Sequence, residues 1–421
     1  MLDKNGVRQL CYLVWIDDIE PIVGSDNCEA AIVGGWKVMV RKGTFQPEDM
    51  AIYFEIDSHV DTNKPEFAFL EKKHGNIKTQ KYTFGGKNPG FYSQGLLMSI
   101  KDFGWHPGEL ERTDGTHCLI AVTPEGEYFE VGDFLTERLG VTYYEQNDIK
   151  RKATNSDLKI NSVLNRHPKI AKKYGKFIKK HKIIKWLFLI LFGRKKDNKT
   201  AFPTKFSFVK KSDEERCENM PWILENKTPF VKTTKIDGTS TLFVLERKPF
   251  NKREFYVCSR NVRQLTPNQK TYHSDNVYWS VEFKYHIKDF LEDMLKQHPD
   301  WNYVALQGET AGVGEDGGKI QGDPHNFGEL RFFGYNFIDP IKGRWGSIEA
   351  KKLVSEYGIE WVPIVDENYI LPDNFEEFKL SADGPCEAPG ASGMREGYVY
   401  RNINNPNLSF KNVSRNYLLK H

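Results

Sequence analysis

The sequence predicts an α+β protein in which a small N-terminal β-barrel precedes a larger domain of antiparallel sheets and helices. Three observations lead to this prediction. The chain has 421 residues, which is more than one domain of ordinary size. Short strand patterns separated by glycine turns fill residues 8–145, whereas strand patterns mixed with a long helical pattern fill the chain from residue 206 onward. The predicted parts are a barrel domain at 1–148, a basic insert at 149–205 and an α+β domain at 206–421.

The N-terminal part carries about five short strand patterns. Apolar and polar residues alternate clearly in Trp36–Arg41, for example, and glycines flank this stretch as turns. The expected strands cover residues 8–16, 36–41, 51–56, 94–98 and 118–122. Such an arrangement is typical of a small barrel such as the OB-fold. OB-folds often bind oligonucleotides, but the fold by itself does not establish that function.

The composition is that of a globular protein from a reducing compartment. Hydrophobic residues make up 39% and aromatic residues 13% of the chain. No apolar stretch approaches the roughly 18 residues of a membrane-spanning helix, and the N-terminus lacks a signal-peptide pattern. The six cysteines are scattered without a CxxC pair, which argues against a disulfide framework and against a zinc site. We therefore expect a cytoplasmic protein without stable membrane insertion.

A strongly basic segment separates the two expected domains. Residues 151–200 hold sixteen Lys or Arg against two Asp, a local charge of +14, whereas the whole chain carries only +3. The apolar run Trp186–Phe192 near its end is too short to cross a bilayer. Three interpretations stay open: packing within the protein or against a second copy, association with nucleic acid through the lysines, and binding in a membrane interface.

The second domain combines strands with one long helix. Its expected strands cover residues 231–234, 241–246, 254–258, 303–308, 331–338, 397–401 and 408–413, with a helix at 280–296 and a glycine-rich loop at 312–318.

One lysine of this domain lies between two strand patterns. Lys235 is followed by Ile236-Asp237-Gly238-Thr239-Ser240, and the glycine lets the chain bend or approach a ligand closely. On its own, this short motif is more simply explained as a strand end and a turn. A nucleophilic lysine must lose its proton, which near pH 7 costs roughly 4–5 kcal/mol unless the site lowers its pKa. A nearby metal cation lowers the pKa of a lysine because like charge disfavours the ammonium form.

Further charged and aromatic residues lie at the ends of other strand patterns. These residues are Arg260, Glu309, Phe332, Glu396 and Lys411. Each has an ordinary structural explanation when taken singly. Together with Lys235 and Asp237 they supply what adenylyl transfer needs, namely an amine nucleophile, acids for a divalent metal and cations for a phosphate. The acids are expected to hold the metal through its waters, because magnesium dehydrates reluctantly.

At these positions the sequence resembles the covalent nucleotidyltransferases, the superfamily of RNA ligases, DNA ligases and mRNA capping enzymes. The segments that match its ordered motifs are Lys235–Gly238, Ser259–Asn261, Glu309, Phe332, Glu396–Gly397 and Lys411. Within the superfamily the chain is most similar to the Deinococcus-type RNA ligases, which carry an OB domain before the transferase domain. The N-terminal stretches that resemble theirs are Glu20–Ile22, Gly35–Val38, Val40–Gly43 and Tyr53–Ser58. The resemblance implies an OB-fold domain followed by an α+β nucleotidyltransferase domain of the ATP-grasp-like ligase type.

The resemblance also implies a chemical role for the acidic residues and the first lysine. Lys235 would attack the α-phosphate of ATP and hold AMP as a phosphoramidate. Asp237, Glu309 and Glu396 would organise a hydrated Mg²⁺ or Mn²⁺ ion.

A second set of residues would contact the nucleotide. By resemblance, Arg260 would bind the ribose, Phe332 would stack on adenine and Lys411 would bind the α-phosphate. Gly238 and Ser240 would lie against the nucleotide as well. The chain departs from the family at Ser240, where some relatives have asparagine, and at Ser409, where a second lysine is common.

We therefore expect an ATP-dependent RNA ligase that joins RNA 3′-OH and 5′-phosphate ends at nicks in duplexes and acts in RNA repair. Its intermediates would be a lysyl-AMP adduct and an adenylylated RNA 5′ end. Two alternatives stay open: a GTP-dependent mRNA capping guanylyltransferase, which uses the same lysine chemistry, and a non-catalytic RNA-binding protein of the OB type. Labelling by ATP and by GTP separates the first alternative from a ligase, and the intact set of charged residues argues against the second.

Overall fold

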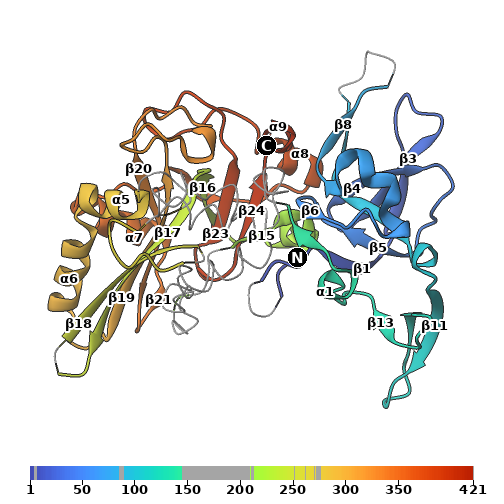
Figure 1. The fold of residues 1–421 in the computed structure, drawn as a ribbon, viewed down its shortest axis with the longest axis horizontal. Coiled ribbons are helices and arrows are strands. Elements are labelled where there is room, and N and C mark those ends of the chain that lie inside the picture. The colour runs from blue at the N-terminus through green and yellow to red at the C-terminus, as the bar shows by residue number, and fades with distance from the viewer. Residues whose placement is uncertain are drawn as a thin grey trace, which may run out of the picture. The chain divides into compact units, whose positions relative to one another are not determined.

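The architecture was obtained as a computed structural model, drawn in Figure 1. The structure describes residues 1–3, 7–84, 90–144, 209 and 213–420, with the exception of residues 251, 261, 270 and 272–275 in the last range. The basic insert predicted at 149–205 therefore lies outside the described residues.

The N-terminal domain consists of short antiparallel sheets, coloured blue to teal in Figure 1. Its elements are β1 (Cys11–Trp15), β2 (Asp18–Pro21), β3 (Cys28–Val33), β4 (Trp36–Arg41), β5 (Met50–Phe54), β6 (Ser58–His59), η1 (Pro65–Lys73), β7 (Asn76–Ile77), β8 (Gln80–Tyr82), β9 (Phe91–Ser93), β10 (Leu96–Ser99), η2 (Ile100–Phe103), β11 (His106–Glu111), β12 (His117–Val122), β13 (Tyr128–Glu130), α1 (Thr136–Leu139) and β14 (Thr142–Tyr143). The sheets have the strand orders β1-β5-β10, β2-β3-β4, β11-β12-β13, β14-β6-β7 and β8-β9.

Strands β1 and β5 form the centre of this domain. Their residues alternate between two apolar clusters, with Leu13 and Ile52 in one cluster and Tyr12 and Tyr53 in the other. Because successive side chains of a strand point to opposite faces, a strand buried on both faces has an almost continuously apolar sequence. This explains why Met50–Phe54 contains no polar side chain except the tyrosine hydroxyl.

All five strands expected in this domain are present, as β1, β4, β5, β10 and β12. The sequence did not indicate several others. Strands β2, β6, β7, β8, β9 and β13 have only two to four residues, which is too short to display a period of two. β3 is longer, but its sequence contains two alanines, a residue type that is depleted in strands.

The C-terminal domain is built on two five-stranded sheets. Its elements are β15 (Glu215–Arg216), η5 (Cys217–Asn219), η6 (Pro221–Glu225), β16 (Phe230–Lys235), β17 (Thr239–Lys248), β18 (Lys252–Ser259), α5 (Val277–Tyr285), α6 (Ile287–Gln297), β19 (Tyr303–Ala311), η7 (Ile320–Gly322), β20 (Arg331–Asp339), β21 (Gly343–Arg344), α7 (Ser347–Glu356), β22 (Ile364–Tyr369), α8 (Phe375–Leu380), β23 (Gly397–Asn402), β24 (Ser409–Val413) and α9 (Arg415–Lys420). One sheet has the order β18-β17-β19-β20-β21 and the other the order β15-β24-β23-β16-β22.

Buried apolar clusters fix the strands of both sheets, two of them in the first sheet and one in the second. In the first sheet, Phe243 and Leu306 pack with Phe290 and Leu291 of α6; Figure 1 shows α5 and α6 beside β17, β18 and β19. In the second sheet, an aromatic cluster contains Phe230, Tyr400 and Phe410 together with Phe378 of α8. All the expected strands of this domain are present, and all of them end within a few residues of the predicted limits.

The helix expected at 280–296 is two helices, α5 and α6. They meet at His286, whose φ of 50° is in the left-handed region and ends α5. The apolar residues continue on both sides of this position, so their pattern alone did not reveal the break.

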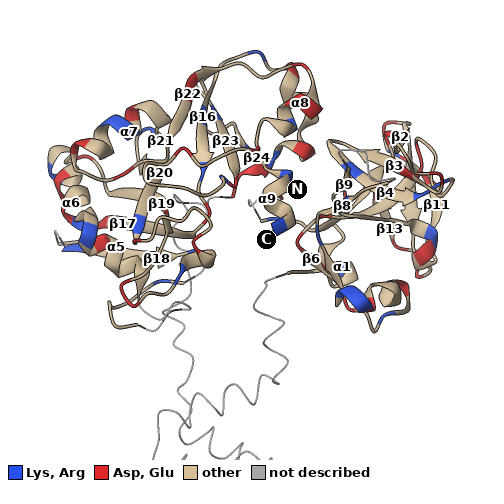
Figure 2. Ribbon diagram, turned by 90° about the horizontal axis from the view of Figure 1, so that it is seen from above, with Lys and Arg blue, Asp and Glu red and all other residues tan. Residues whose placement is uncertain are grey.

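Charge in the described part of the chain is mixed. Lys or Arg and Asp or Glu follow one another along α6 and α7 (Figure 2). The strong positive excess of the sequence is in residues 151–200, outside the described ranges. Among the helices that the structure describes, none combines the length and the apolar character needed to span a bilayer.

A buried ion pair fixes the start of the C-terminal domain. Glu218 of η5 and Lys379 of α8 are both completely buried, and Lys379 Nζ lies 2.7 Å from Glu218 Oε1. Lys379 also donates to the backbone oxygen of Val413, at 3.3 Å. The pair therefore ties η5 and α8 to β24.

Replacing only one partner of this pair should destabilise the protein severely. In Lys379→Met, Glu218 remains buried without its counter-charge, and we expect a loss of about 3–5 kcal/mol in the free energy of unfolding. Urea unfolding followed by circular dichroism measures this loss. Lys342→Met is the matched control, because Lys342 and its partner Glu349 are both about half exposed, and it should cost about 1 kcal/mol or less. The double variant Glu218→Leu/Lys379→Met should be more stable than Lys379→Met; equal or lower stability would contradict this account.

Candidate active site

Lys235 and Glu396 meet because of the register of two neighbouring strands. Lys235 is the last residue of β16, and it pairs with Gly397, the first residue of β23. Glu396 directly precedes β23, and its Oε2 lies 2.6 Å from Nζ of Lys235. Phe230, the first residue of β16, and Ile236, directly after Lys235, are both buried and anchor the strand at its two ends. An amine and a carboxylate from residues far apart in the sequence are thus in direct contact.

Gly238 lets strand β19 approach the loop that follows Lys235. A Cβ atom at Gly238 would lie 2.3 Å from the backbone oxygen of Thr310, so a larger residue has to displace β19. β17 pairs with β19 so that Ser240 lies opposite Glu309. The glycine is required here for space, and it brings Glu309 within electrostatic reach of Lys235.

The charges around Lys235 are not balanced. Burial alone lowers the pKa of Lys235, but the surrounding carboxylates, Glu396 foremost, raise it above its ordinary value. Burial and the neighbouring acids raise the pKa of Glu309 to about 8. Burial, together with the charge of Glu396, also raises the pKa of Asp237. One ammonium group therefore faces three acids that resist being ionised together.

Asp237 is held by two residues that the sequence did not indicate. The hydroxyl of Tyr417 in α9 donates a hydrogen bond to its carboxylate. The backbone N–H of Asp237 donates to Nε2 of His325, at 2.8 Å. Tyr417 and His325 come from a C-terminal helix and from a loop, and neither lies in a motif that marks a site. We find no sequence signal that could have identified them.

Lys411 and Arg260 are brought together by a third missed residue, Asp213. The carboxylate of Asp213 lies 2.9 Å from Nζ of Lys411 and 2.7 Å from a guanidinium nitrogen of Arg260. Burial alone raises the pKa of Asp213, but these two cations hold it well below its usual range. Burial lowers the pKa of Lys411, and Asp213 partly offsets this effect, whereas the charge of Lys235 adds to it. The two lysines of the site are therefore within electrostatic reach of each other.

Ser240 lies beside the acids, whereas Phe332 does not. The Ser240 hydroxyl is 3.1 Å from the hydroxyl of Tyr335. Phe332 is completely buried, with its ring packed on Phe243 at a centroid distance of 5.5 Å. A Cβ atom added to Gly308 would lie 2.3 Å from the Phe332 ring.

The position of Phe332 follows from the alternation of side chains along a strand. Gly308 and Glu309 are consecutive in β19, so the Phe332 ring, which lies against Gly308, is on the face of the sheet opposite to Glu309. In this conformation the ring offers no exposed surface for a base. The structure therefore brings together Lys235 and the three acids and leaves Phe332 in the core.

The acidic residues suit a hydrated cation better than a directly bound one. Within the described ranges, no set of three or more His, Cys, Asp or Glu side chains is placed to bind a metal ion directly. Burial and neighbouring acids raise the pKa values of Asp237 and Glu309, so added positive charge would favour their ionised forms. A divalent cation held through its water ligands would supply that charge from a greater distance.

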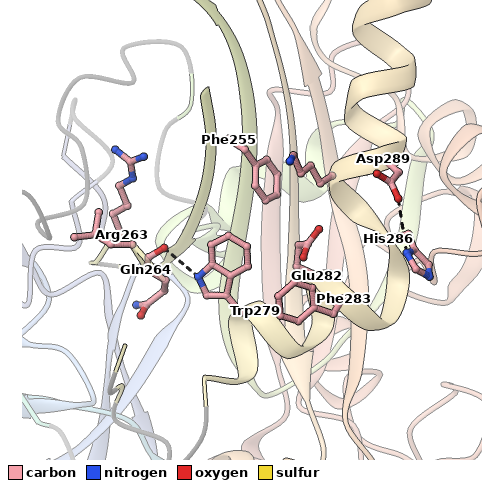
Figure 3. A pocket seen from close by; sticks show the side chains of 10 residues that line it. Phe255, Arg263, Gln264, Trp279, Glu282, Phe283, His286 and Asp289 are labelled. Carbon is pink, nitrogen blue, oxygen red and sulfur yellow. Dashed lines mark hydrogen bonds and ion pairs between the residues drawn. The ribbon is translucent and has the colours of Figure 1, made fainter. Parts of the chain in front are cut away.

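A separate cavity of about 480 Å³ lies next to α5 (Figure 3). Phe255, Trp279 and Phe283 form its aromatic wall, and the indole N–H of Trp279 donates to the backbone oxygen of Gln264, at 3.1 Å. None of the residues that line it belongs to the site around Lys235.

Comparisons with known proteins identify both domains. A family model described as an OB-fold domain matches residues 10–99, and one described as RNA ligase matches residues 228–417. A comparison with curated protein sequences gives no match.

The chain is also similar over its full length to solved structures of an RNA ligase from Naegleria gruberi. A mutant of that ligase without ligand is 26% identical, with a TM-score of 0.66 and coverage of 99% of both chains. A mutant with ATP and Mn is 25% identical, with a TM-score of 0.66 and the same coverage. The structure with PPi is 26% identical, with a TM-score of 0.65 and again 99% of both chains.

The match to residues 228–417 includes Lys235, Glu309, Glu396 and Lys411, and the OB-fold match precedes it as the resemblance implied. Residues 228–417 therefore form an RNA ligase domain, and an OB-fold domain precedes it in the chain.

Proposed function

We propose that this RNA ligase uses ATP to form a covalent AMP adduct on Lys235 and then seals RNA 3′-OH and 5′-phosphate ends at nicks in duplexes, as a step in RNA repair. The observation that carries the proposal is the contact of 2.6 Å between Lys235 and Glu396, inside a group of acids that includes Asp237 and Glu309. The ATP and Mn in the related Naegleria gruberi structures support the choice of nucleotide and of a divalent metal.

In the first step Nζ of Lys235 attacks the α-phosphorus of ATP. The N–P bond forms as the bond between the α-phosphorus and the bridging oxygen breaks, and pyrophosphate leaves with the electron pair. Lys235 must lose a proton for this attack, yet its raised pKa keeps it an ammonium ion in the protein alone. Asp237, Glu309 and Glu396 would hold Mg²⁺ or Mn²⁺ through its waters, and this positive charge would favour the neutral amine and offset charge on the phosphate.

The cations opposite the acids are suited to the nucleotide. Lys411 and Arg260 both contact the carboxylate of Asp213, so they already hold an anion in the absence of ATP. We assign Lys411 to the α-phosphate and Arg260 to the ribose, with Gly238 and Ser240 beside them. The assignment of Phe332 to adenine requires its ring to leave the core, and it remains a prediction.

The second step takes place at the same α-phosphorus, and the third takes place at the phosphorus of the RNA 5′-phosphate. An oxygen of the RNA 5′-phosphate attacks the α-phosphorus of the adduct, which breaks the N–P bond and leaves an adenylylated RNA end. The 3′-OH then attacks the 5′-phosphorus, AMP leaves, and a phosphodiester forms. Lys235 acts as nucleophile only in the first step, so this step can be bypassed with an RNA that already carries AMP.

Replacing Lys235 should abolish the adduct. After incubation with α-labelled ATP and Mg²⁺, the wild type should carry label that is stable to denaturation, and Lys235→Ala should carry none. Lys342→Ala is the control, because this lysine is half exposed and its ammonium group pairs with Glu349, away from the site. Labelling of Lys235→Ala at the wild-type level would show that another residue is the nucleophile. Stronger labelling by GTP than by ATP would favour a capping enzyme.

Metal binding to the free enzyme should become tighter as the pH rises toward 8. Because the pKa of Glu309 is raised to about 8, this acid is mostly protonated at pH 7, and a cation has to displace the proton. We expect affinity for Mn²⁺ to fall by up to about tenfold per pH unit below 8, with protons released on binding. Calorimetric titration in buffers of different ionisation enthalpy measures both quantities. Glu309→Gln should reduce the proton release, with Asp237 supplying the remainder, while Glu349→Gln should release as many protons as the wild type. A wild-type affinity that does not change with pH would contradict the prediction.

The sealing reaction should depend on RNA ends and, in part, on Lys235. In matched nicked duplexes with RNA or DNA on each side, we expect the all-RNA nick to be sealed and the all-DNA nick to remain open. Lys235→Ala should seal an RNA nick whose 5′ end already carries AMP, without ATP, because the first step is then complete. Gel electrophoresis of a labelled strand measures sealing. A nick with a 5′-OH is the negative control, and efficient sealing of DNA would refute RNA specificity.

A further inference from the structure

His325 lies in a loop whose backbone is tightly defined. The loop connects η7 to β20, and its residues Asp323 and Asn326 both have a φ of 53°. The buried carboxylate of Asp323 accepts hydrogen bonds from the backbone N–H groups of Phe327 and Gly328, each at 3.0 Å. The His325 side chain between these turns is completely buried. The imidazole is therefore presented in one orientation by a loop that its neighbours hold.

Both ring nitrogens of His325 have backbone partners. Nε2 lies 2.8 Å from the backbone nitrogen of Asp237, and Nδ1 lies 3.0 Å from the backbone oxygen of Met394. A backbone N–H only donates and a carbonyl only accepts, so Nε2 must carry the lone pair and Nδ1 the proton. The neutral ring with its proton on Nδ1 is the form that satisfies both partners.

The two partners belong to the two segments that carry the reacting groups. Asp237 is two residues after Lys235, and Met394 is two residues before Glu396. Strands β16 and β23 pair up to Lys235 and Gly397, and beyond this pair their ladder ends. The imidazole bridges the two segments directly after that point.

The backbone of the loop reinforces this bridge. The backbone oxygen of His325 accepts hydrogen bonds from the N–H groups of Ser392 and Gly393, each at 3.1 Å. A Cβ atom at Gly393 would lie 2.1 Å from the backbone oxygen of Pro324, so the two backbones touch. The loop is thus fixed to the segment before Glu396, and its ring reaches across to the segment after Lys235.

We propose that His325 is a positioning residue for the ligase reaction, and that its bond to the Asp237 backbone sets the placement of the Lys235–Asp237 loop relative to Glu396. This inference rests on the proposed function of Lys235. The ring acts through the residues that it holds and touches neither ATP nor RNA. Errors of about 1 Å in the placement of reacting groups can lower rates about a hundredfold, so one hydrogen bond at this location has a large effect.

Two conservative variants separate the two bonds of the ring. The side-chain oxygen of Gln reaches the position of Nε2 and can accept from Asp237, whereas the amide nitrogen of Asn reaches the position of Nδ1 and can donate to Met394. Leu at this position makes neither bond. If the Asp237 bond is the one that matters, Gln should restore function and Asn should not.

The experiment measures single-turnover formation of the AMP adduct at several ATP concentrations. We expect His325→Leu and His325→Asn to lower the maximal rate about 10- to 100-fold, while the ATP concentration for half-maximal rate changes less than about threefold, since Lys411 and Arg260 are untouched. His325→Gln should retain at least about a third of the wild-type rate. Val281→Ala removes apolar volume from the core at α5 and is the control for general destabilisation. Its rate should match that of the wild type once it is corrected for the folded fraction.

The possible outcomes are distinct. Hydrogen exchange at residues 236–238, faster in Leu and Asn than in Gln, should confirm which variants lose the bond without any reaction taking place. A normal rate in His325→Leu, equal losses in Gln and Leu, or a loss explained by unfolding alone would overturn the positioning role while leaving the proposed function intact. If the wild type forms no adduct on Lys235, the proposed function fails, and the positioning role fails with it.

Discussion

An excess of negative charge around one lysine is the constraint on which the catalytic domain depends. Glu396, Glu309 and Asp237 surround Lys235 in a space where burial makes each charge expensive. In the protein alone these acids hold the lysine as an unreactive ammonium ion. The same acids are the groups through which added positive charge can act. Under the proposed function, this arrangement would keep Lys235 inactive until metal and ATP are both present.

The backbone around the site is built to keep these charges close together. The 2.3 Å separation that a Cβ atom at Gly238 would have from Thr310 shows that the loop after Lys235 lies directly on β19. On the other side, His325 connects this loop to the segment before Glu396. The loop is therefore held from both sides, and the second contact is made by a side chain outside the family motifs.

The sequence predicted the parts of this site that depend on strand ends. Lys235 ends β16, Glu396 directly precedes β23 and Glu309 lies near the end of β19. The ends of paired strands are neighbours, so the motifs could be joined by reasoning about sheets. The two-domain fold could be predicted for a related reason, since glycine turns and strand periods are local signals. The comparisons confirm the OB-fold and RNA ligase assignments.

The sequence could not predict on which face of a sheet a side chain lies, or which residues outside the strands enter the site. The motif around Phe332 specifies an aromatic residue, but the face of the sheet on which it lies depends on the pairing of β19 with β20, where the register shifts between Gln307 and Gly308. Asp213 and His325 enter the site from segments without a periodic pattern, and long-range contacts of this kind leave no local signal. The division of the expected helix at His286 was likewise hidden, because the apolar pattern continues across it.

Asp213 occupies the two cations, Lys411 and Arg260, that are proposed to bind the nucleotide. Lys411 and Arg260 hold its carboxylate at 2.9 and 2.7 Å. Under the proposed assignment, the α-phosphate and the ribose of ATP would have to displace this carboxylate. Because Asp213 is tethered to the same chain, it competes at a high effective concentration that dilution does not reduce. The free energy of nucleotide binding would then be the difference between two interactions of Lys411 and Arg260, one with the nucleotide and one with the carboxylate of Asp213. Under this assignment, the carboxylate of Asp213 would restore both ion pairs as AMP departs.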